Sequence, residues 1–338
     1  MEYVVDRLKE LMAIPSPTGF TRAAAEYVKS ELEALGFKPE FTNKGGVLVS
    51  LGGEGDPLVL SAHLDTLGAM VAEIKGNGRL RLLPVGGLMP QNAEVENCVI
   101  HTRMSDKKYS GTFQMNDPSV HVNREYAAQE RKFSNMEVVI DEKVFTKEDT
   151  QKLGISVGDF VSFDPRTTIT DSGFIKSRFL DDKLSVAILL GFAKCVADGS
   201  ARLSRKVYIY ITVFEEVGHG CSGAIPEDAA EIISVDMGCV GEGLECNELK
   251  VSICAKDSHG PYNYDVTTKL IRCAEEKKLS YAVDLYPYYG SDADAALDAG
   301  HELRHGLIGA GVYASHGYER SHIDGARNTL ELIKAYTA

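Results

Sequence analysis

Acidic and imidazole side chains occur in five separate segments of the chain, each next to the end of a predicted strand or the start of a predicted helix. Carboxylates and imidazoles that gather at one place supply the oxygen and nitrogen ligands of a divalent metal site. Because this set contains no thiolate, it favours zinc, cobalt or manganese over a structural, Cys-rich zinc site. The segments carry His63 and Asp65, Asp181 and Asp182, Glu215 and Glu216, Asp236, and His316.

Each segment also has an ordinary structural explanation. An Asp before a helix is usually an N-cap, so Asp181 or Asp182 could serve only to cap the helix that follows. A His-x-Asp pair after a strand is commonly a loop pair, and adjacent Glu residues at a strand end are usually solvated. The metal hypothesis depends on all five segments together, because so many carboxylates buried at one sheet edge would repel one another without cations.

The stereochemistry of a strand limits the roles of Glu215 and Glu216. Successive side chains point to opposite faces, so this pair can converge only where the strand breaks, and Val217–Gly220 provides a break. One Glu can then bind a metal while its neighbour handles a proton. His63 and Asp65 are two positions apart, so Asp65 can hold the second ring nitrogen of His63. Five ligands exceed the needs of one catalytic ion and fit two ions roughly 3.5–4 Å apart that share a carboxylate.

The elements that must position these residues are buried strands that alternate with helices. The segment 207–214 is apolar on both faces, as a central strand of a covered, mostly parallel sheet requires. In such sheets, sites form beyond the carboxyl ends of the strands, where the five segments fall. The pattern predicts a three-layer α/β fold. Further strands are predicted at 57–61, 232–235 and 307–313, and helices at 4–12, 21–35, 183–196, 262–278 and 325–336.

Residues 67–165 have a different character. They contain short alternating apolar runs at 69–74, 80–83, 95–101, 136–140 and 159–163, with frequent Gly and Pro and little helical periodicity. This pattern predicts an inserted β-rich domain at 67–165. The catalytic domain would then comprise residues 1–66 and 166–338.

Length and charge exclude several classes of protein. A chain of 338 residues corresponds to about two domains. The net charge of −13 argues against a basic nucleic-acid surface or a polybasic membrane anchor. The seven Cys residues form no C-x-x-C pair, and the N-terminus has no apolar signal region. The longest apolar run, 186–193, is too short to span a membrane. We therefore expect a soluble, cytoplasmic protein with neither nucleic-acid nor membrane partners.

The five segments resemble, in order, the motif blocks of the dinuclear zinc aminopeptidases, and above all of the M42 family. The spacing supports this family, because the 118 positions from His63 to Asp181 leave room for a domain there. M20 peptidases insert their lid after the Glu-Glu block, M28 enzymes typically lack a comparable insertion, and M18 chains are considerably longer. The matching blocks are His63-Leu-Asp65, Leu180-Asp-Asp182, Phe214-Glu-Glu-Val-Gly218, Val235-Asp236 and Ser315-His316, with Leu82–Gly87 and Gly290–Ala293 as further matches.

The resemblance implies a set of residue roles. It implies an aminopeptidase with two divalent metal ions per subunit. The expected metal is zinc, and cobalt or manganese are the alternatives. One ion would be held by His63, Asp182 and Asp236. The other would be held by Asp182, Glu216 and His316, which makes Asp182 the bridge. Glu215 would be the general base, Asp65 would support His63, and Asp292 would lie near the substrate pocket. The partners would be peptide substrates and other copies of the chain, with the inserted domain driving dimerisation and dimers building a dodecamer.

Four positions depart from the family pattern without removing a metal ligand. Thr66 stands where an acid is common, Lys183 replaces an Arg, Tyr289 replaces a Gly, and Gly317 follows His316 where Ser-Pro is common. They bear on substrate preference and on the strength of the activity. Two alternatives to an aminopeptidase remain: a non-catalytic or differently specialised homologue, and a glycoside hydrolase. A glycoside hydrolase would use two carboxyl groups and no metal, leaves the His residues without a purpose, and lacks Trp here.

Overall fold

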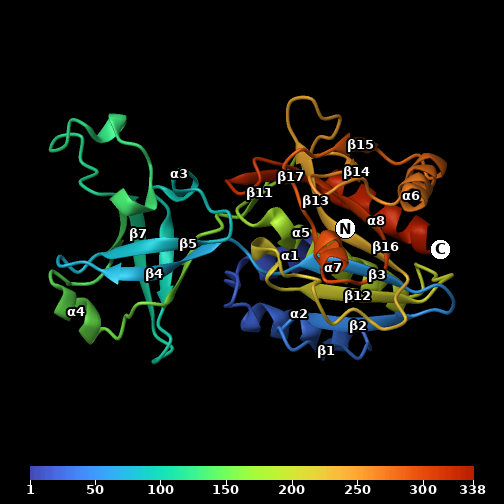
Figure 1. Cartoon of the computed structure of the whole chain (residues 1–338), viewed down its shortest axis with the longest axis horizontal. Helices are drawn as coiled ribbons and strands as arrows, with labels where there is room; N and C mark the ends of the chain where they lie inside the picture. Colours follow the sequence, from blue (N-terminus) through green and yellow to red (C-terminus); the bar gives the residue numbers. More distant parts are fainter. The chain divides into compact units, whose positions relative to one another are not determined.

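The computed structural model describes residues 1–338, which form two compact units (Figure 1). The sheet unit comprises Met1–Asp65 and Arg166–Ala338, and the barrel unit comprises Thr66–Pro165. No helix in either unit combines the length and the apolar composition that crossing a membrane requires.

The sheet unit is built on an eleven-stranded sheet with a parallel centre. Its four central strands run parallel to one another: β12 (Val207–Thr212), β3 (Leu58–His63), β13 (Glu231–Val240) and β16 (Arg304–Tyr313). The prediction of a parallel sheet is confirmed for this centre, whereas the flanking strands are mostly antiparallel, so the sheet as a whole is mixed. The flanking strands are β1 (Glu40–Phe41), β2 (Val47–Gly52), β10 (Thr168–Ile169), β11 (Phe174–Ser177), β14 (Val251–Lys256), β15 (Tyr281–Leu285) and β17 (Glu319–His322).

Strand β3 shows why the centre of the sheet is parallel and covered. Each of its residues is buried. Leu58 and Leu60 belong to the hydrophobic cluster on one face, and Val59 belongs to the cluster on the other. A strand that is apolar on both faces gains from helices on both sides of the sheet, which parallel connections provide.

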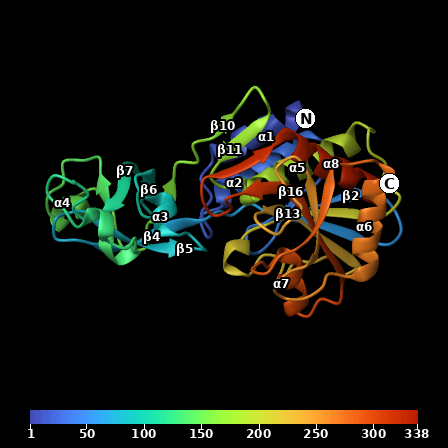
Figure 2. The same cartoon turned by 90° about the horizontal axis from the view of Figure 1, so that it is seen from above.

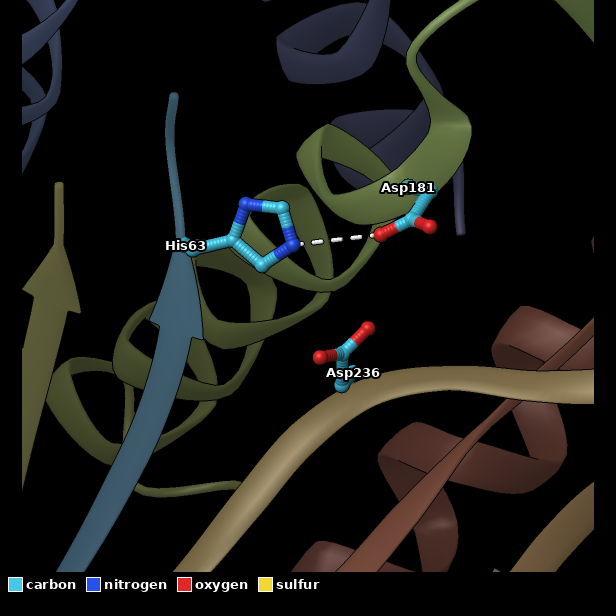
Figure 3. Close-up of side chains that lie close together, drawn as sticks. All are labelled: His63, Asp181 and Asp236. Atoms are coloured by element: carbon cyan, nitrogen blue, oxygen red, sulfur yellow. Dashed lines mark hydrogen bonds and ion pairs between the residues drawn. The ribbon is translucent and has the colours of Figure 1, made fainter. Parts of the chain in front are cut away.

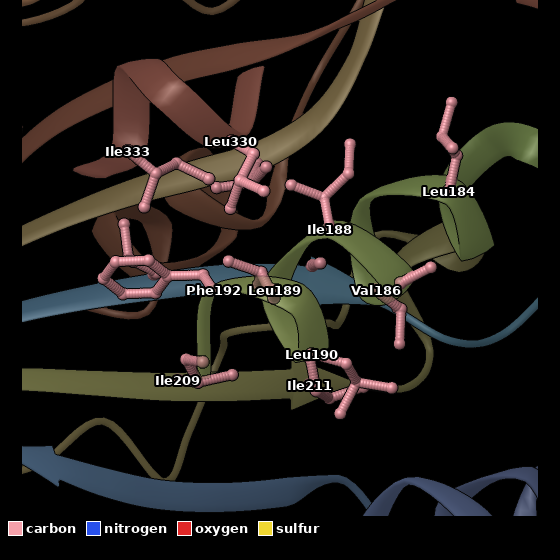
Figure 4. Packing of buried hydrophobic residues seen from close by; sticks show 14 of the residues in the cluster. Leu184, Val186, Ile188, Leu189, Leu190, Phe192, Ile209, Ile211, Leu330 and Ile333 are labelled. Carbon is pink, nitrogen blue, oxygen red and sulfur yellow. The ribbon is translucent and has the colours of Figure 1, made fainter. Parts of the chain in front are cut away.

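Helices cover both faces of the sheet (Figure 2). On one face α5 (Leu180–Ala197) is apolar nearly all round and packs between the sheet and its neighbouring helices, with Ile188 and Phe192 in the core that Figure 4 shows. On the other face, α7 (Asp292–Asp298) buries Ala293 and Ala296 in the same cluster as Val59. The remaining helices are α1 (Glu2–Met12), α2 (Arg22–Ala34), α6 (Tyr264–Glu276) and α8 (Ile323–Thr337).

The barrel unit is a closed six-stranded barrel. Five of its strands lie in the apolar runs of the sequence, whereas β7 (Lys108–Met115) was not predicted. Its polar residues Lys108, Ser110, Thr112 and Gln114 alternate with Tyr109, Gly111, Phe113 and Met115, so the strand has a period of two, but only Phe113 and Met115 are large, fully buried apolar residues. The other strands are β4 (Gly68–Ile74), β5 (Leu80–Val85), β6 (Asn97–His101), β8 (Met136–Ile140) and β9 (Phe160–Phe163), with short helices α3 (Pro90–Ala93) and α4 (Lys147–Lys152).

Candidate metal centre

The residues predicted to bind metal come together at the carboxyl ends of the central parallel strands. His63 is the last residue of β3, and Asp236 lies on β13 beyond the stretch that pairs with β3. The short 3-10 turn Glu215–Val217 follows β12, and His316 follows β16. Parallel register places these ends at one sheet edge, as the sequence predicted.

His63, Asp181 and Asp236 form the first half of the centre. Their ligand atoms all lie within 4.8 Å of one another, and all three residues are buried. The ring Nε2 of His63 lies 3.1 Å from Asp181 Oδ1, and the Asp236 carboxylate stands opposite this pair (Figure 3). Three different elements therefore deliver one nitrogen and two carboxylates to a single point.

Asp181 also forms the second half of the centre. Its Oδ2 lies 3.7 Å from His316 Nε2, and the same nitrogen lies 3.5 Å from Glu216 Oε2. Asp181 therefore presents one oxygen to His63 and the other to His316. A carboxylate placed in this way has the geometry needed to be shared by two metal ions.

This geometry corrects the bridge assignment that the family resemblance suggested for Asp182. Asp182 is fully buried, and its Oδ2 accepts a hydrogen bond from the backbone N–H of His63 at 3.1 Å. The reason lies in the start of α5, where both residues leave helical geometry, with φ/ψ of −76°/98° at Asp181 and −125°/26° at Asp182. Their peptide bond is cis. Asp181 faces the histidine rings, whereas Asp182 holds the backbone of β3 through Oδ2 and keeps a buried Oδ1 without a hydrogen-bond partner.

The break after β12 brings Glu215 and Glu216 to the same site. It begins at Phe214, whose φ of +70° is unusual for a residue with a side chain, earlier than the Val217–Gly220 break that the sequence suggested. Glu215 Oε2 lies 3.7 Å from His63 Nε2. Each Glu therefore faces one of the two histidines.

Positive φ values recur beside the other site segments. Phe179, just before Asp181, has φ +67°, and His316 itself has φ +62°. Such backbone conformations cost of order 1–3 kcal/mol each and cluster where function requires a particular side-chain direction. The packing of the surrounding sheet unit offsets this cost.

Asp65 has a different role from the predicted one. Its backbone carbonyl, and not its carboxylate, lies at hydrogen-bond distance (2.9 Å) from His63 Nδ1. The carboxylate accepts hydrogen bonds from the backbone N–H groups of Glu215 (3.1 Å) and Glu216 (3.3 Å), and from the hydroxyl of Thr18. Asp65 thus fixes both the imidazole and the turn that carries the two Glu residues.

Glu319 is a site residue that sequence reasoning missed. One carboxylate oxygen accepts the backbone N–H of Asp181 at 3.1 Å, and the other accepts the backbone N–H of His316 at 3.0 Å. Glu319 is buried on β17, three residues after His316. Only this short spacing from a candidate ligand could have pointed to it, because no strand-end pattern marks it.

The electrostatics of the centre suit cations. Burial raises the pKa values of Glu215 and Glu216 well above their usual range, and burial together with the charge of Asp181 raises the pKa of Asp236 to about 7. Burial lowers the pKa of His63, but the carboxylates around it, Glu215 first, outweigh this and raise it. Divalent ions would offset the repulsion that these shifts express.

A chemical test of fit gives the same answer. Glu216 Oε1 is buried and has no hydrogen-bond partner, which is costly for a carboxylate unless a cation is bound. The donor set contains two imidazoles and several carboxylates and no thiolate, which suits zinc, cobalt or manganese. The residues present therefore fit the metal ions that the sequence predicted.

A cavity of about 300 Å³ adjoins the centre. One side of it carries the metal-centre residues, and the other carries Tyr288, Tyr289 and one face of α7. Asp292 is among the lining residues, where it accepts hydrogen bonds from the Thr212 hydroxyl at 2.5 Å and from the Cys221 backbone N–H at 3.0 Å. Asp292 therefore ties α7 to β12 and to the loop after the Glu turn.

A second acidic cluster contributes His259 and Asp294 to the lining of this cavity. Asp257, His259 and Asp294 place their ligand atoms within 4.8 Å of one another. In this cluster, however, the carboxylates already accept hydrogen bonds. Asp257 accepts one from the Tyr262 hydroxyl at 2.6 Å, and Asp294 accepts one from the Ser291 backbone N–H at 2.8 Å. The same residue types are satisfied here without a cation.

Comparisons with known proteins identify the family of this chain and its structural neighbours. The profile of the family described as M42 glutamyl aminopeptidase matches residues 45–332. The putative aminopeptidase YhfE of Bacillus subtilis is 45% identical over 334 residues, covering 98% of this chain and 96% of that protein. Among solved structures, an aminopeptidase of Desulfurococcus kamchatkensis superposes with a TM-score of 0.87 at 21% identity, over 99% of this chain and 94% of that one. The TET1 peptidase of Pyrococcus horikoshii superposes with a TM-score of 0.86 at 22% identity, over 99% of both chains.

Proposed function

Because this chain belongs to the M42 glutamyl aminopeptidase family, we propose that it removes N-terminal residues from peptides with two divalent metal ions bound around Asp181. The observation that supports this most directly is the position of Asp181 between two histidines, with one oxygen toward His63 and the other toward His316. A structural carboxylate would not need this two-sided arrangement.

The ligand sets follow from the contacts. His63, Asp181 and Asp236 would hold one ion, and Asp181, Glu216 and His316 the other. When bound, the ions would lower the pKa of a water molecule and polarise the scissile carbonyl. Asp65, Asp182 and Glu319 hold the backbone of the segments that carry these ligands, so the ligands are placed before any ion binds.

Glu215 is the proposed general base. It lines the cavity, it is not needed to complete either ligand set, and burial raises its pKa above the usual range, which favours a carboxyl group that takes up a proton. Glu215 would accept a proton from the attacking water and return it to the leaving amine. The two roles predicted for the Glu pair are thereby divided, with Glu216 toward the metals and Glu215 toward the proton.

A panel of aminoacyl-p-nitroanilides tests the proposal. Protein stripped of metal is assayed alone and after addition of zinc, cobalt or manganese, and metal content is measured in the same samples. We expect hydrolysis only with metal and about two ions per chain. Bound metal without hydrolysis of any aminoacyl substrate would support a non-catalytic homologue, and hydrolysis of a glycoside that persists in chelator would support the glycosidase alternative.

We also propose that the chain forms homo-oligomers, dimers that build a dodecamer. The TET1 neighbour is described as assembling into a tetrahedron or an octahedral shell. The barrel unit of this chain exposes large apolar side chains, among them Met104 (86% exposed) and Phe145 (79%), which a second copy could cover. Light scattering after size-exclusion chromatography measures the mass, and a monomer at micromolar concentration would contradict the proposal.

A further inference from the structure

The cavity beside the metal centre carries a negative charge that the proposed chemistry does not use. Resting on the function proposed above, we infer that this cavity selects peptides whose first residue is Lys or Arg, and that Asp298 is the residue that pairs with the basic side chain.

The geometry of α7 places Asp298 toward the cavity. Ser291, Asp294, Ala295 and Asp298 all line it, and their spacing of three and four residues puts them on one face of the helix. Ala295 in the middle of this stripe has only a methyl group, which leaves room for a substrate side chain. This face of α7 therefore has a small side chain, Ala295, at its centre and the Asp298 carboxylate at the C-terminal end of the helix.

Asp298 is the carboxylate of this strip that is free to pair with a ligand. The Asp292 carboxylate accepts hydrogen bonds from Thr212 and Cys221, and the Asp294 carboxylate accepts them from Ser291 and Tyr262. Asp298 is exposed and has no hydrogen bond or ion pair. The Asp298 carboxylate is therefore available to form an ion pair with a cationic ligand in the cavity.

The charge balance of the cavity favours a cation. Its lining contains no Lys or Arg. Two divalent ions would offset the carboxylates of the metal centre, among them Glu216, whose Oε1 is buried without a hydrogen-bond partner. The Asp298 carboxylate then remains as unpaired negative charge, which attracts a basic side chain and repels an acidic one.

An aromatic ring in the same lining adds to this preference. The Tyr288 side chain is 95% exposed, so almost none of its ring is covered by protein. Aromatic faces attract ammonium and guanidinium groups, and they also cover the methylene stem of a Lys or Arg. Tyr288 and Asp298 together match the two parts of a basic side chain, its apolar stem and its charged end.

The dimensions are also compatible. Asp298 lies six residues after Asp292, so it is displaced by about 9 Å along the helix axis from the residue that anchors α7 beside the Glu turn. An extended Lys or Arg side chain reaches roughly 6–7 Å from its Cα. Asp298 is thus the α7 lining residue furthest along the helix from Asp292, where a long basic side chain extends further than the shorter side chain of Asp or Glu.

The experiment measures kcat/KM for Lys-, Arg-, Leu- and Glu-p-nitroanilides with metal-loaded wild-type protein and two variants, Asp298→Asn and Asp298→Lys. Wild type should prefer Lys and Arg. Asp298→Asn should lower kcat/KM for Lys and Arg about fivefold and leave Leu unchanged, since one partly screened ion pair is lost. Asp298→Lys should lower kcat/KM for the Lys and Arg substrates further, and it should raise kcat/KM for the Glu substrate relative to the Leu substrate. Asp171→Asn removes an exposed carboxylate that does not line the cavity and should change none of the ratios.

The outcomes separate this inference from the proposed function. If Asp298→Asn lowers kcat/KM equally for all four substrates, Asp298 binds the α-amino group or stabilises the fold, and the selectivity inference is wrong. A wild-type preference for Leu or Glu that Asp298→Asn does not change would also overturn it, while leaving the aminopeptidase activity intact. If the metal-loaded protein hydrolyses none of the four substrates, the proposed function is wrong instead.

Discussion

Two clusters of one His and two Asp contribute residues to the lining of the same cavity and differ in what satisfies their carboxylates. In the metal centre, His63, Asp181 and Asp236 face one another with few hydrogen-bond donors between them. In the second cluster, the two carboxylates accept hydrogen bonds from hydroxyl and backbone N–H groups. Residue type and proximity alone therefore do not identify a metal site, and the supply of competing donors distinguishes the two.

The difference extends to the surroundings of each cluster. The metal centre is backed by Asp65, Asp182 and Glu319, whose oxygens hold backbone N–H groups of the segments that bear the ligands. These three residues accept the local backbone donors, so Glu216 Oε1 stays without a partner, and Asp236 Oδ1 accepts one backbone N–H, that of Met237. In the second cluster no such residues intervene, and the donors reach Asp257 and Asp294 directly. The candidate metal centre therefore differs from the second cluster in where the nearby hydrogen-bond donors are directed.

The strongest test of this comparison removes one carboxylate from each cluster. Asp181→Ala should abolish binding of both ions and lower kcat/KM by at least about a thousandfold, because this residue faces both halves of the centre. Asp257→Asn, the matched change in the second cluster, should leave about two ions per chain. Metal content is measured by atomic emission after gel filtration. Equal metal loss in both variants would mean that the second cluster also binds metal and that the comparison is wrong.

Glu215→Gln separates proton transfer from metal binding within the first cluster. We expect kcat to fall about 10²- to 10⁴-fold, the usual contribution of a general base, while metal content stays at the wild-type value. The variant keeps the size and the hydrogen-bonding capacity of the side chain, so folding should be unaffected. Full activity in Glu215→Gln would exclude it as the base.

Glu319→Gln tests whether the backing carboxylates position the ligands. A Gln can accept one of the two backbone N–H groups through its oxygen but presents an amide donor to the other, so the segments of Asp181 and His316 should separate. We expect metal affinity to fall about 10- to 100-fold, with activity recovered at high zinc. Asp171→Asn, which changes an exposed carboxylate outside the centre, is the control. Lost activity that zinc does not restore would indicate a role other than positioning.

The sequence predicted the parallel centre of the sheet and the meeting of five segments at its edge, because both follow from apolar runs and from parallel topology. It did not distinguish Asp181 from Asp182, since that depends on the non-helical backbone at the start of α5, which no periodicity shows. Glu319 was missed for a similar reason, because it acts on backbone N–H groups that meet only in the folded chain. The sequence pattern therefore predicted where the candidate site lies, whereas the proposed role of each residue depends on the backbone geometry of the folded chain.

The smallest expected effect concerns the proton that the second cluster holds in place of a cation. Burial and the neighbouring Asp257 carboxyl raise the pKa of Asp294 from 3.8 to about 7. Between about pH 4 and pH 7 the folded protein therefore binds more protons than the unfolded chain, and the stability from this group falls as pH rises, by at most about 1.4 kcal/mol per unit. Asp294→Asn should remove this slope, so its melting temperature should rise relative to wild type between pH 5 and pH 7. Calorimetry of the zinc-loaded proteins measures the difference, with the exposed Asp265→Asn as control. If the melting temperatures of Asp294→Asn and wild type run parallel across this range, no proton is held there and the contrast between the two clusters loses its electrostatic basis.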